Sequence, residues 1–154
     1  NDAGMARASA YLGIVYIILG DYEKAKNILE KSLCIYTTHL SKNHVGAAWV
    51  LAHLGNAYGE LGNYEKARQL LEQSILLYKE HFPEDHIKVG WALSYLGDVY
   101  RVTGEYEKAK QALEKSMAIY KKQLPENHIV VAGILVYLSD IHKDLGEYEK
   151  RNNY

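Results

Sequence analysis

One pattern of apolar and polar positions recurs along the chain with a constant step of 42 residues. Two series mark this step: Leu12, Leu54, Leu96 and Leu138, and Tyr22, Tyr64, Tyr106 and Tyr148. A fixed period of this length is typical of a stacked array, in which each copy buries its apolar face against its neighbours. The sequence therefore predicts one repeat array over residues 1–154, with copies at about 3–44, 45–86 and 87–128 and a truncated copy at 129–154.

Each copy contains two stretches with helical periodicity, which we call its A helix and its B helix. In the second copy, Leu54 and Tyr58 lie one helical turn apart in the A helix. Gly62 stands where a left-handed cap would end that helix, and Asn63 can cap the B helix that follows. The A helices are expected at about 3–19, 45–61, 87–103 and 129–145, and the B helices at about 22–38, 64–80 and 106–122.

The ends of the copies carry further expectations. The A helices are predicted to have N-caps at Asn43, Asp85 and Asn127. The B helix of the fourth copy is expected to begin near Glu147 and to stop at Tyr154, and Arg151 stands where the other copies have alanine. We therefore expect a fragment of a longer array, or a chain whose open end another subunit covers.

Small and aromatic side chains account for much of the predicted packing. Four small residues one turn apart suit a close approach between neighbouring A helices, and they are Ala48, Ala52, Gly55 and Gly59. Six recurring tyrosines are expected to pack in the core, and they are Tyr16, Tyr58 and Tyr100 on the A helices and Tyr36, Tyr78 and Tyr120 on the B helices.

The order Leu-Gly-x-x-Tyr, followed by a glycine and then an alanine, resembles the tetratricopeptide repeat. It begins at Leu12, Leu54 and Leu96, with glycine at 20, 62 and 104 and alanine at 25, 67 and 109. The tryptophan of the family pattern is replaced by Ser9, Leu51, Leu93 and Leu135, and its phenylalanine by Leu29, Leu71 and Leu113. The 42-residue period, which is longer than the usual 34 residues, is similar to that of kinesin light chains.

The resemblance implies a fold and a role. The implied fold is an all-α, right-handed α-solenoid of antiparallel helix pairs. The implied role is that of a protein–protein interaction scaffold or adaptor, which holds a peptide or a partner protein in a concave groove lined by the A helices.

The candidate groove residues are A-helix positions that core packing leaves over and that differ between copies. They are Arg7, Tyr11, Trp49, His53, Asn56, Glu60, Trp91, Tyr95, Asp98, Arg101, Tyr137 and Asp140. A groove that contacts different parts of one ligand needs such variation, although surface positions under relaxed constraint would vary as well.

Two of the candidates are tryptophans, a residue type enriched in interface hot spots. Trp49 and Trp91 would either anchor a partner in the groove or pack on the next A helix in place of the missing tryptophan. By the resemblance, Asn56 would hold the backbone of a ligand. The lysine of a carboxylate clamp is absent, because Ala52 and Ser94 stand at the corresponding place, so a C-terminal carboxylate ligand is disfavoured.

Composition and charge narrow the range of partners. The net charge of −1 over 154 residues leaves no strongly basic surface, which argues against a nucleic-acid partner. Acidic residues of the later part of the groove, offset in part by Arg101 and Lys143, favour a basic or mixed-charge ligand, and they are Asp98, Asp140, Asp144 and Glu60. No apolar run approaches the roughly 20 residues of a membrane span, and the first residues lack the regions of a signal peptide, so we expect a cytoplasmic protein with no membrane partner.

No residue pattern indicates catalysis, a metal or a cofactor. A nucleophile with its base and a phosphate-binding loop are both missing from the sequence, so we expect no enzyme activity. Recurring His44, His86 and His128 are expected to cap or pack, because copies about 10 Å apart cannot bring one histidine each to one metal ion. Cys34 is expected to be a small helix thiol. The alternative to a groove-binding scaffold is a structural or self-associating spacer, a homo-oligomer formed through the open C-terminal end.

Overall fold

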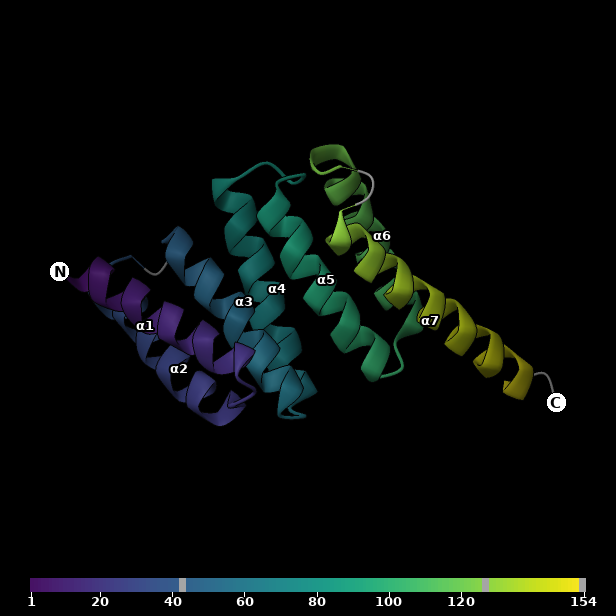
Figure 1. The fold of residues 1–154 in the computed structure, drawn as a ribbon, viewed down its shortest axis with the longest axis horizontal. Helices are drawn as coiled ribbons and strands as arrows, with labels where there is room; N and C mark the ends of the chain where they lie inside the picture. Colours follow the sequence, from purple (N-terminus) through teal and green to yellow (C-terminus); the bar gives the residue numbers. More distant parts are fainter. Residues whose placement is uncertain (42–43, 126–127, 153–154) are drawn as a thin grey trace. The chain divides into compact units, whose positions relative to one another are not determined.

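The protein folds into helices joined by short connections (Figure 1). The structure is a computed structural model that describes residues 1–41, 44–125 and 128–152. These residues contain no strand and seven helices: α1 (Asp2–Ile18), α2 (Tyr22–His39), α3 (Val45–Glu60), α4 (Tyr64–His81), α5 (Ile87–Val102), α6 (Tyr106–Gln123) and α7 (Ile129–Asn152). The first six helices lie at the predicted positions of the A and B helices.

The chain divides into two compact units, Asn1–Phe82 and Pro83–Tyr154. In the first unit, α1 packs on α2 and α3 packs on α4, and α2 also packs on α3. In the second unit, α6 packs on both α5 and α7. The predicted pairing of each A helix with the following B helix is therefore confirmed in three copies. The prediction of one continuous array over residues 1–154 stays a prediction.

Glycine makes the turn within each of these three helix pairs. Gly20, Gly62 and Gly104 have φ values of 80°, 85° and 84°, a left-handed conformation that side chains disfavour. Directly afterwards, the side chain of Asn63 accepts a hydrogen bond from the backbone N–H of Lys66 at 3.3 Å and caps α4. The predicted left-handed cap and the predicted role of Asn63 are both confirmed.

Histidine is the N-cap of α3 and of α5. Nδ1 of His44 accepts from the backbone N–H of Gly46 at 2.9 Å, and Nδ1 of His86 accepts from that of Lys88 at 3.1 Å. The prediction of an N-cap at Asp85 was wrong, because its carboxylate pairs instead with the ammonium group of Lys122 at 2.7 Å. Asn43 and Asn127 lie outside the described residues.

The A and B helices of one copy approach each other closely at a glycine. A Cβ atom on Gly55 would lie 2.8 Å from Cγ of Leu71 on α4. The equivalent atom on Gly97 would lie 2.6 Å from Cγ of Leu113 on α6. The close approach at Gly55 therefore joins α3 to its own B helix and not to a neighbouring A helix, which corrects the prediction for this residue.

The recurring tyrosines have two different environments. Tyr36, Tyr78 and Tyr120 are buried, as predicted. Tyr58 is only half-buried, and its hydroxyl donates a hydrogen bond to Glu30 on α2. The A-helix tyrosine at this position therefore contributes a polar contact between successive copies as well as packing.

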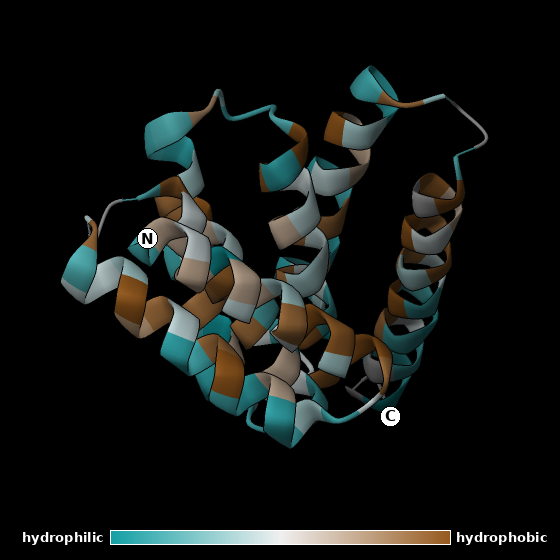
Figure 2. Ribbon diagram, turned by 60° about the vertical axis from the view of Figure 1, so that its left-hand side comes forward, coloured by the Kyte–Doolittle hydropathy of each residue, from teal (hydrophilic) through white to brown (hydrophobic). Residues whose placement is uncertain are grey.

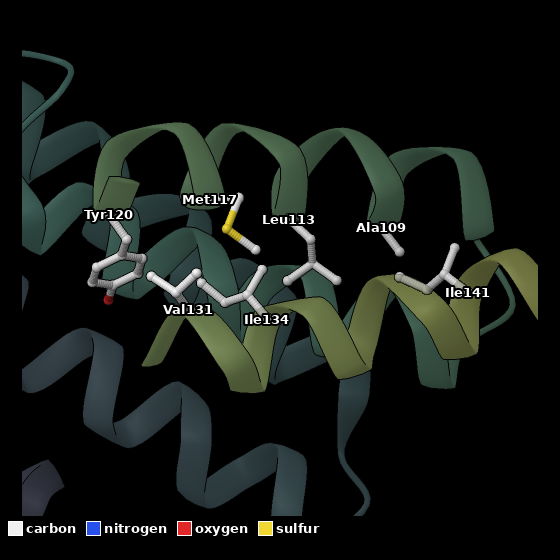
Figure 3. Close-up of a cluster of buried hydrophobic side chains, with 7 residues drawn as sticks. All are labelled: Ala109, Leu113, Met117, Tyr120, Val131, Ile134 and Ile141. Carbon is white, nitrogen blue, oxygen red and sulfur yellow. The ribbon is translucent and has the colours of Figure 1, made fainter. Parts of the chain in front are cut away.

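The core of the second unit lies between α6 and α7 (Figure 3). Seven buried side chains form it: Ala109, Leu113, Met117, Tyr120, Val131, Ile134 and Ile141. Trp91 of α5 and Leu138 of α7 pack against this cluster. α7 is thereby fixed on α6 by one of its faces.

The end of the chain differs from the prediction. α7 continues to Asn152, so the backbone does not turn at Gly146 and no separate B helix begins near Glu147. Residues 146–150 read GEYEK, the same five letters as residues 104–108, where the chain does turn. At the earlier site Ala109 follows and is fully buried, whereas Arg151 follows at the later site and is exposed. The alanine contact that holds a B helix against its A helix is therefore missing.

Candidate functional site

Three aromatic side chains of α1 and α3 form a cluster in the first unit. Tyr11 of α1 meets Trp49 of α3 edge to face, with ring centroids 5.1 Å apart and planes at 68°. Trp49 meets His53, one turn further along α3, at 5.6 Å and 84°. This geometry is a favourable one for aromatic rings. Tyr11 is 57% exposed, and Trp49 and His53 are half-buried, so the cluster can be reached from solvent.

Arg7 adds a positive charge beside this aromatic cluster. It is exposed on α1, one turn before Tyr11. Burial raises the pKa of the Tyr36 hydroxyl on α2, an effect that the charge of Arg7 opposes. Arg7 therefore lies close enough to Tyr36 to act on it.

The two remaining candidates of the first unit lie further along α3. Asn56 is half-buried, one turn beyond His53, and Glu60 is exposed in the last turn of the helix. The helical spacing thus arranges Trp49, His53, Asn56 and Glu60 along one stretch of α3, in the order predicted.

In the second unit, the aromatic pair lies on a single helix. Trp91 and Tyr95 of α5 meet edge to face, with centroids 5.1 Å apart and planes at 72°. Both are half-buried, and Trp91 also packs against the core between α6 and α7. The packing alternative is therefore confirmed for Trp91, and its role as an anchor for a partner stays a prediction.

Arg101 organises the charged part of the second unit. Its Nη2 and Nε atoms donate to one carboxylate oxygen of Asp98 at 2.8 and 3.1 Å. Its guanidinium group lies 5.7 Å from the ring centroid of Tyr137 on α7, a cation–π distance. Burial lowers the pKa of Arg101, but the hydrogen bond that it donates to Asp98 and the charges of Asp98 and Asp140 outweigh this effect, so the pKa is raised.

The two groups of candidates therefore differ in chemistry. The candidates of the first unit combine aromatic rings with the cation Arg7. The second unit offers two carboxylates, Asp98 and Asp140, around one cation that is already paired. In the part of the chain that the structure describes, no group of three His, Cys, Asp or Glu side chains could hold a metal ion.

Sequence reasoning missed two features. The contacts of Tyr11 with Trp49 and of Arg101 with Tyr137 join successive A helices, and the repeat step alone does not indicate them. A pocket of about 320 Å³ also lies between α2, α3 and α4, outside the predicted groove. Leu33, Leu51, Leu76 and Leu77 are among its lining residues. The sequence indicates this pocket only through Leu76, because the other copies have the smaller residues Cys34 and Ala118 at that position. In the structure, Leu76 is 66% exposed.

Comparison with known proteins assigns the family. A model of the tetratricopeptide repeat matches residues 5–80 and 84–150, which together make up most of the chain. The chain belongs to the tetratricopeptide repeat family. This membership supports the general role of a protein–protein interaction scaffold, and it confirms the resemblance found in the sequence. A comparison with curated protein sequences finds no significant match.

Solved structures share the fold of this tetratricopeptide repeat protein. One match is a structure described as nearly identical TPR-like repeats of a kinesin light chain from Podosopora anserina. Its TM-score is 0.84 and its sequence identity 22%, over 97% of this chain and 71% of that one. BtubC (BKLC) from P. vanneervenii matches with a TM-score of 0.85 and 18% identity over 99% of this chain and 61% of its own. The Sgt2 TPR domain from Aspergillus fumigatus matches with a TM-score of 0.70 and 18% identity over 94% of this chain and 82% of its own.

These matches confirm the predicted all-α solenoid class. At these sequence identities, the matches show that the fold is shared and nothing about function. Among the described residues, no helix combines the length and the apolar composition that crossing a membrane requires.

Proposed function

We propose that this protein binds a peptide or a partner protein through the A-helix residues described above. The observation that carries this proposal is the cluster of Tyr11, Trp49 and His53. Two successive A helices hold these rings in fixed edge-to-face contacts and still leave them accessible. Rigid aromatic side chains that are partly exposed supply contact area at a low entropic cost, as interface hot spots do.

The charges of the second unit favour a particular kind of ligand. Asp98 and Asp140 carry two negative charges, and Arg101, whose charge interacts with both, is already bound to Asp98. A ligand segment with basic or mixed charge would therefore be attracted to this unit. We propose no catalytic role, no cofactor and no ligand that is recognised by its C-terminal carboxylate.

A peptide library displayed on phage tests the proposal. Peptides selected on the wild-type chain should lose at least about tenfold in affinity with Tyr11→Ala or Trp49→Ala, the loss expected for a hot-spot aromatic. Leu76→Ala, which removes an exposed side chain from the outer surface of α4, is the matched control and should change nothing. Circular dichroism verifies that each variant is folded.

Two results would contradict the proposal. Selected peptides that bind both aromatic variants as tightly as the wild type would exclude the A-helix cluster as their site. Failure to select any peptide, together with self-association of the purified chain, would favour the alternative of a self-associating spacer.

A further inference from the structure

The pocket between α2, α3 and α4 is a further candidate binding site. Among the described residues, α2 and α4 both pack on α3 but not on each other, and the pocket occupies the space that remains between them. We call it the α2–α4 pocket, and the residues that line it include Leu33 of α2, Leu51 of α3, and Leu76, Leu77 and Glu80 of α4. Its volume of about 320 Å³ is at the lower end of the range of ligand-binding pockets. None of the A-helix candidates lines it, so this site is separate from the one proposed above.

The lining of the pocket is apolar and partly exposed. Leu51 and Leu77 are buried, Leu33 is half-buried and Leu76 is mostly exposed. Figure 2 shows that hydrophobic and hydrophilic residues alternate along the helices. On α4, every exposed residue except Leu76 is polar or charged. Leu76 therefore leaves apolar surface in water that a bound side chain would cover.

Neither the packing nor the rest of the array accounts for a leucine at position 76. The other copies have Cys34 and Ala118 there, and their helices pair in the same way. In a repeat array each copy contacts only its neighbours, so a further copy would extend the array at one end. It would not fill a pocket that lies between two complete copies. The group that covers Leu76 therefore comes from outside the array.

Glu80 gives the pocket a negative charge. It is the one charged residue among the described residues that line the pocket, and no other described residue pairs with it. It lies in the last turn of α4, where the partial negative charge of the helix end adds to that of the carboxylate. Lys79 and His81 share this turn, but neither lines the pocket. The pocket therefore complements an apolar group that has a cation next to it.

We propose that the α2–α4 pocket binds a segment of a partner protein that carries a large apolar side chain close to a lysine or an arginine. The apolar side chain would pack against Leu33, Leu51 and Leu76, and the cation would lie beside Glu80. Leu76 and Glu80 are one turn of α4 apart, about 6 Å along its axis. The two groups of the ligand are therefore two residues apart in an extended segment, or one turn apart in a helical one.

The open edge of the pocket favours a protein segment over a free small molecule. Pockets for small molecules usually enclose most of the ligand. Here the exposed side chains of Thr37, Gln73 and Leu76 line the pocket, so a small molecule would remain largely in water. A protein segment has a backbone and neighbouring side chains that can cover Leu76 while one side chain fills the pocket, as anchor residues of interfaces do.

A subtractive selection of phage-displayed peptides tests the proposal. A library of short random peptides is first depleted on Leu76→Arg, which retains the A-helix residues, and is then selected on the wild-type chain. Peptides selected in this way should combine a large apolar residue with a lysine or an arginine about two to four positions away. In fluorescence anisotropy, Leu76→Arg should weaken their binding at least about tenfold, and Glu80→Gln about two- to fivefold, the size expected for one exposed ion pair.

Two variants serve as controls. Glu114→Gln removes an exposed carboxylate of α6, outside the pocket, and should leave the binding of these peptides unchanged. Tyr11→Ala should also leave it unchanged, so that failure of one proposed site is distinguished from failure of the other. Circular dichroism verifies that each variant is folded.

Three results would overturn the proposal. The first is that no selected peptide binds the wild type more tightly than Leu76→Arg. The second is that the selected peptides lack basic residues or bind Glu80→Gln as tightly as the wild type. The third is light scattering that shows a dimer of the wild type and a monomer of Leu76→Arg, because a second copy would then occupy the pocket.

Discussion

The hydroxyl of Ser74 on α4 donates a hydrogen bond to the backbone carbonyl of Ala48 on α3, at 2.6 Å, and both residues are fully buried. The same bond joins α2 to α1 and α6 to α5, with the two partners 26 positions apart in the sequence each time. Because a hydroxyl can reach the carbonyl in one register only, this bond fixes how far each B helix slides along its A helix. The repeat therefore carries a polar contact in its core.

Removal of this hydroxyl should destabilise the protein. Ser74→Ala deletes the donor but leaves the packing almost unchanged, so the free energy of unfolding should fall by about 1 kcal/mol, the usual net worth of a buried hydrogen bond. Urea denaturation followed by circular dichroism measures the change. Gln73→Ala, at the exposed neighbouring position on the same helix, is the control. Equal stability of Ser74→Ala and Gln73→Ala would show that the bond adds nothing.

The repeat step predicted most of the fold because it reports packing directly. Leu54 and Gly55 recur in the same order in three copies; the structure buries the glycine in all three, and the leucine in the second and third copies, whereas Leu12 of the first copy is 44% exposed. Gly62 predicted the turn correctly because a left-handed backbone strongly favours glycine. The periodicity could not distinguish a neighbouring A helix from the helix's own partner, so it misplaced the contact of Gly55.

The end of the chain shows the limit of local sequence. The letters GEYEK form a turn and a helix start at residues 104–108 and part of a continuous helix at residues 146–150. Gly104 has φ of 84°, whereas Gly146 lies within α7. Tertiary contacts decide between the two conformations. Ala109 is buried after the first GEYEK, whereas Arg151, at the equivalent position after the second, is exposed and makes no such contact. The prediction of the site had the same limit. Tyr11 and Trp49 lie on two different helices, and the repeat pattern does not indicate that their rings are in contact.

Two glycines of the A helices should respond to alanine in opposite directions. In Gly55→Ala, the new Cβ would lie 2.8 Å from Leu71 Cγ and 3.3 Å from the carbonyl oxygen of Ala67, so we expect a loss of about 1–3 kcal/mol. Gly133 lies within α7 with no atom within 4 Å of an added Cβ, so Gly133→Ala should stabilise by about 1 kcal/mol through helix propensity alone. Thermal unfolding of both variants measures the signs, and a gain in stability for Gly55→Ala would contradict the close approach.

The histidine caps should be replaceable by a better-known capping residue. His44→Ala removes the acceptor for the backbone N–H of Gly46 and should cost about 1 kcal/mol of stability, the usual effect of a lost N-cap. His44→Asn supplies a side-chain oxygen at the same position and should restore most of that loss. Urea denaturation distinguishes the two variants. If both lose the same amount of stability, His44 acts through its contact with the ring of Tyr36 and not as a cap.

The contact between Tyr58 and Glu30 predicts a dependence on alkaline pH. The hydrogen bond that Glu30 accepts, assisted by burial, raises the pKa of Tyr58 from 10.0 to about 12. Because the folded state favours the neutral phenol, the stability from this bond is fully present below about pH 10 and is lost as the pH rises through about 12. The chain has 14 tyrosines, so the absorbance titration of Tyr58→Phe is subtracted from that of the wild type to isolate one group. The difference should have its midpoint near 12, and in a Glu30→Gln background it should move toward 10. An unchanged midpoint in that background would assign the shift to burial alone.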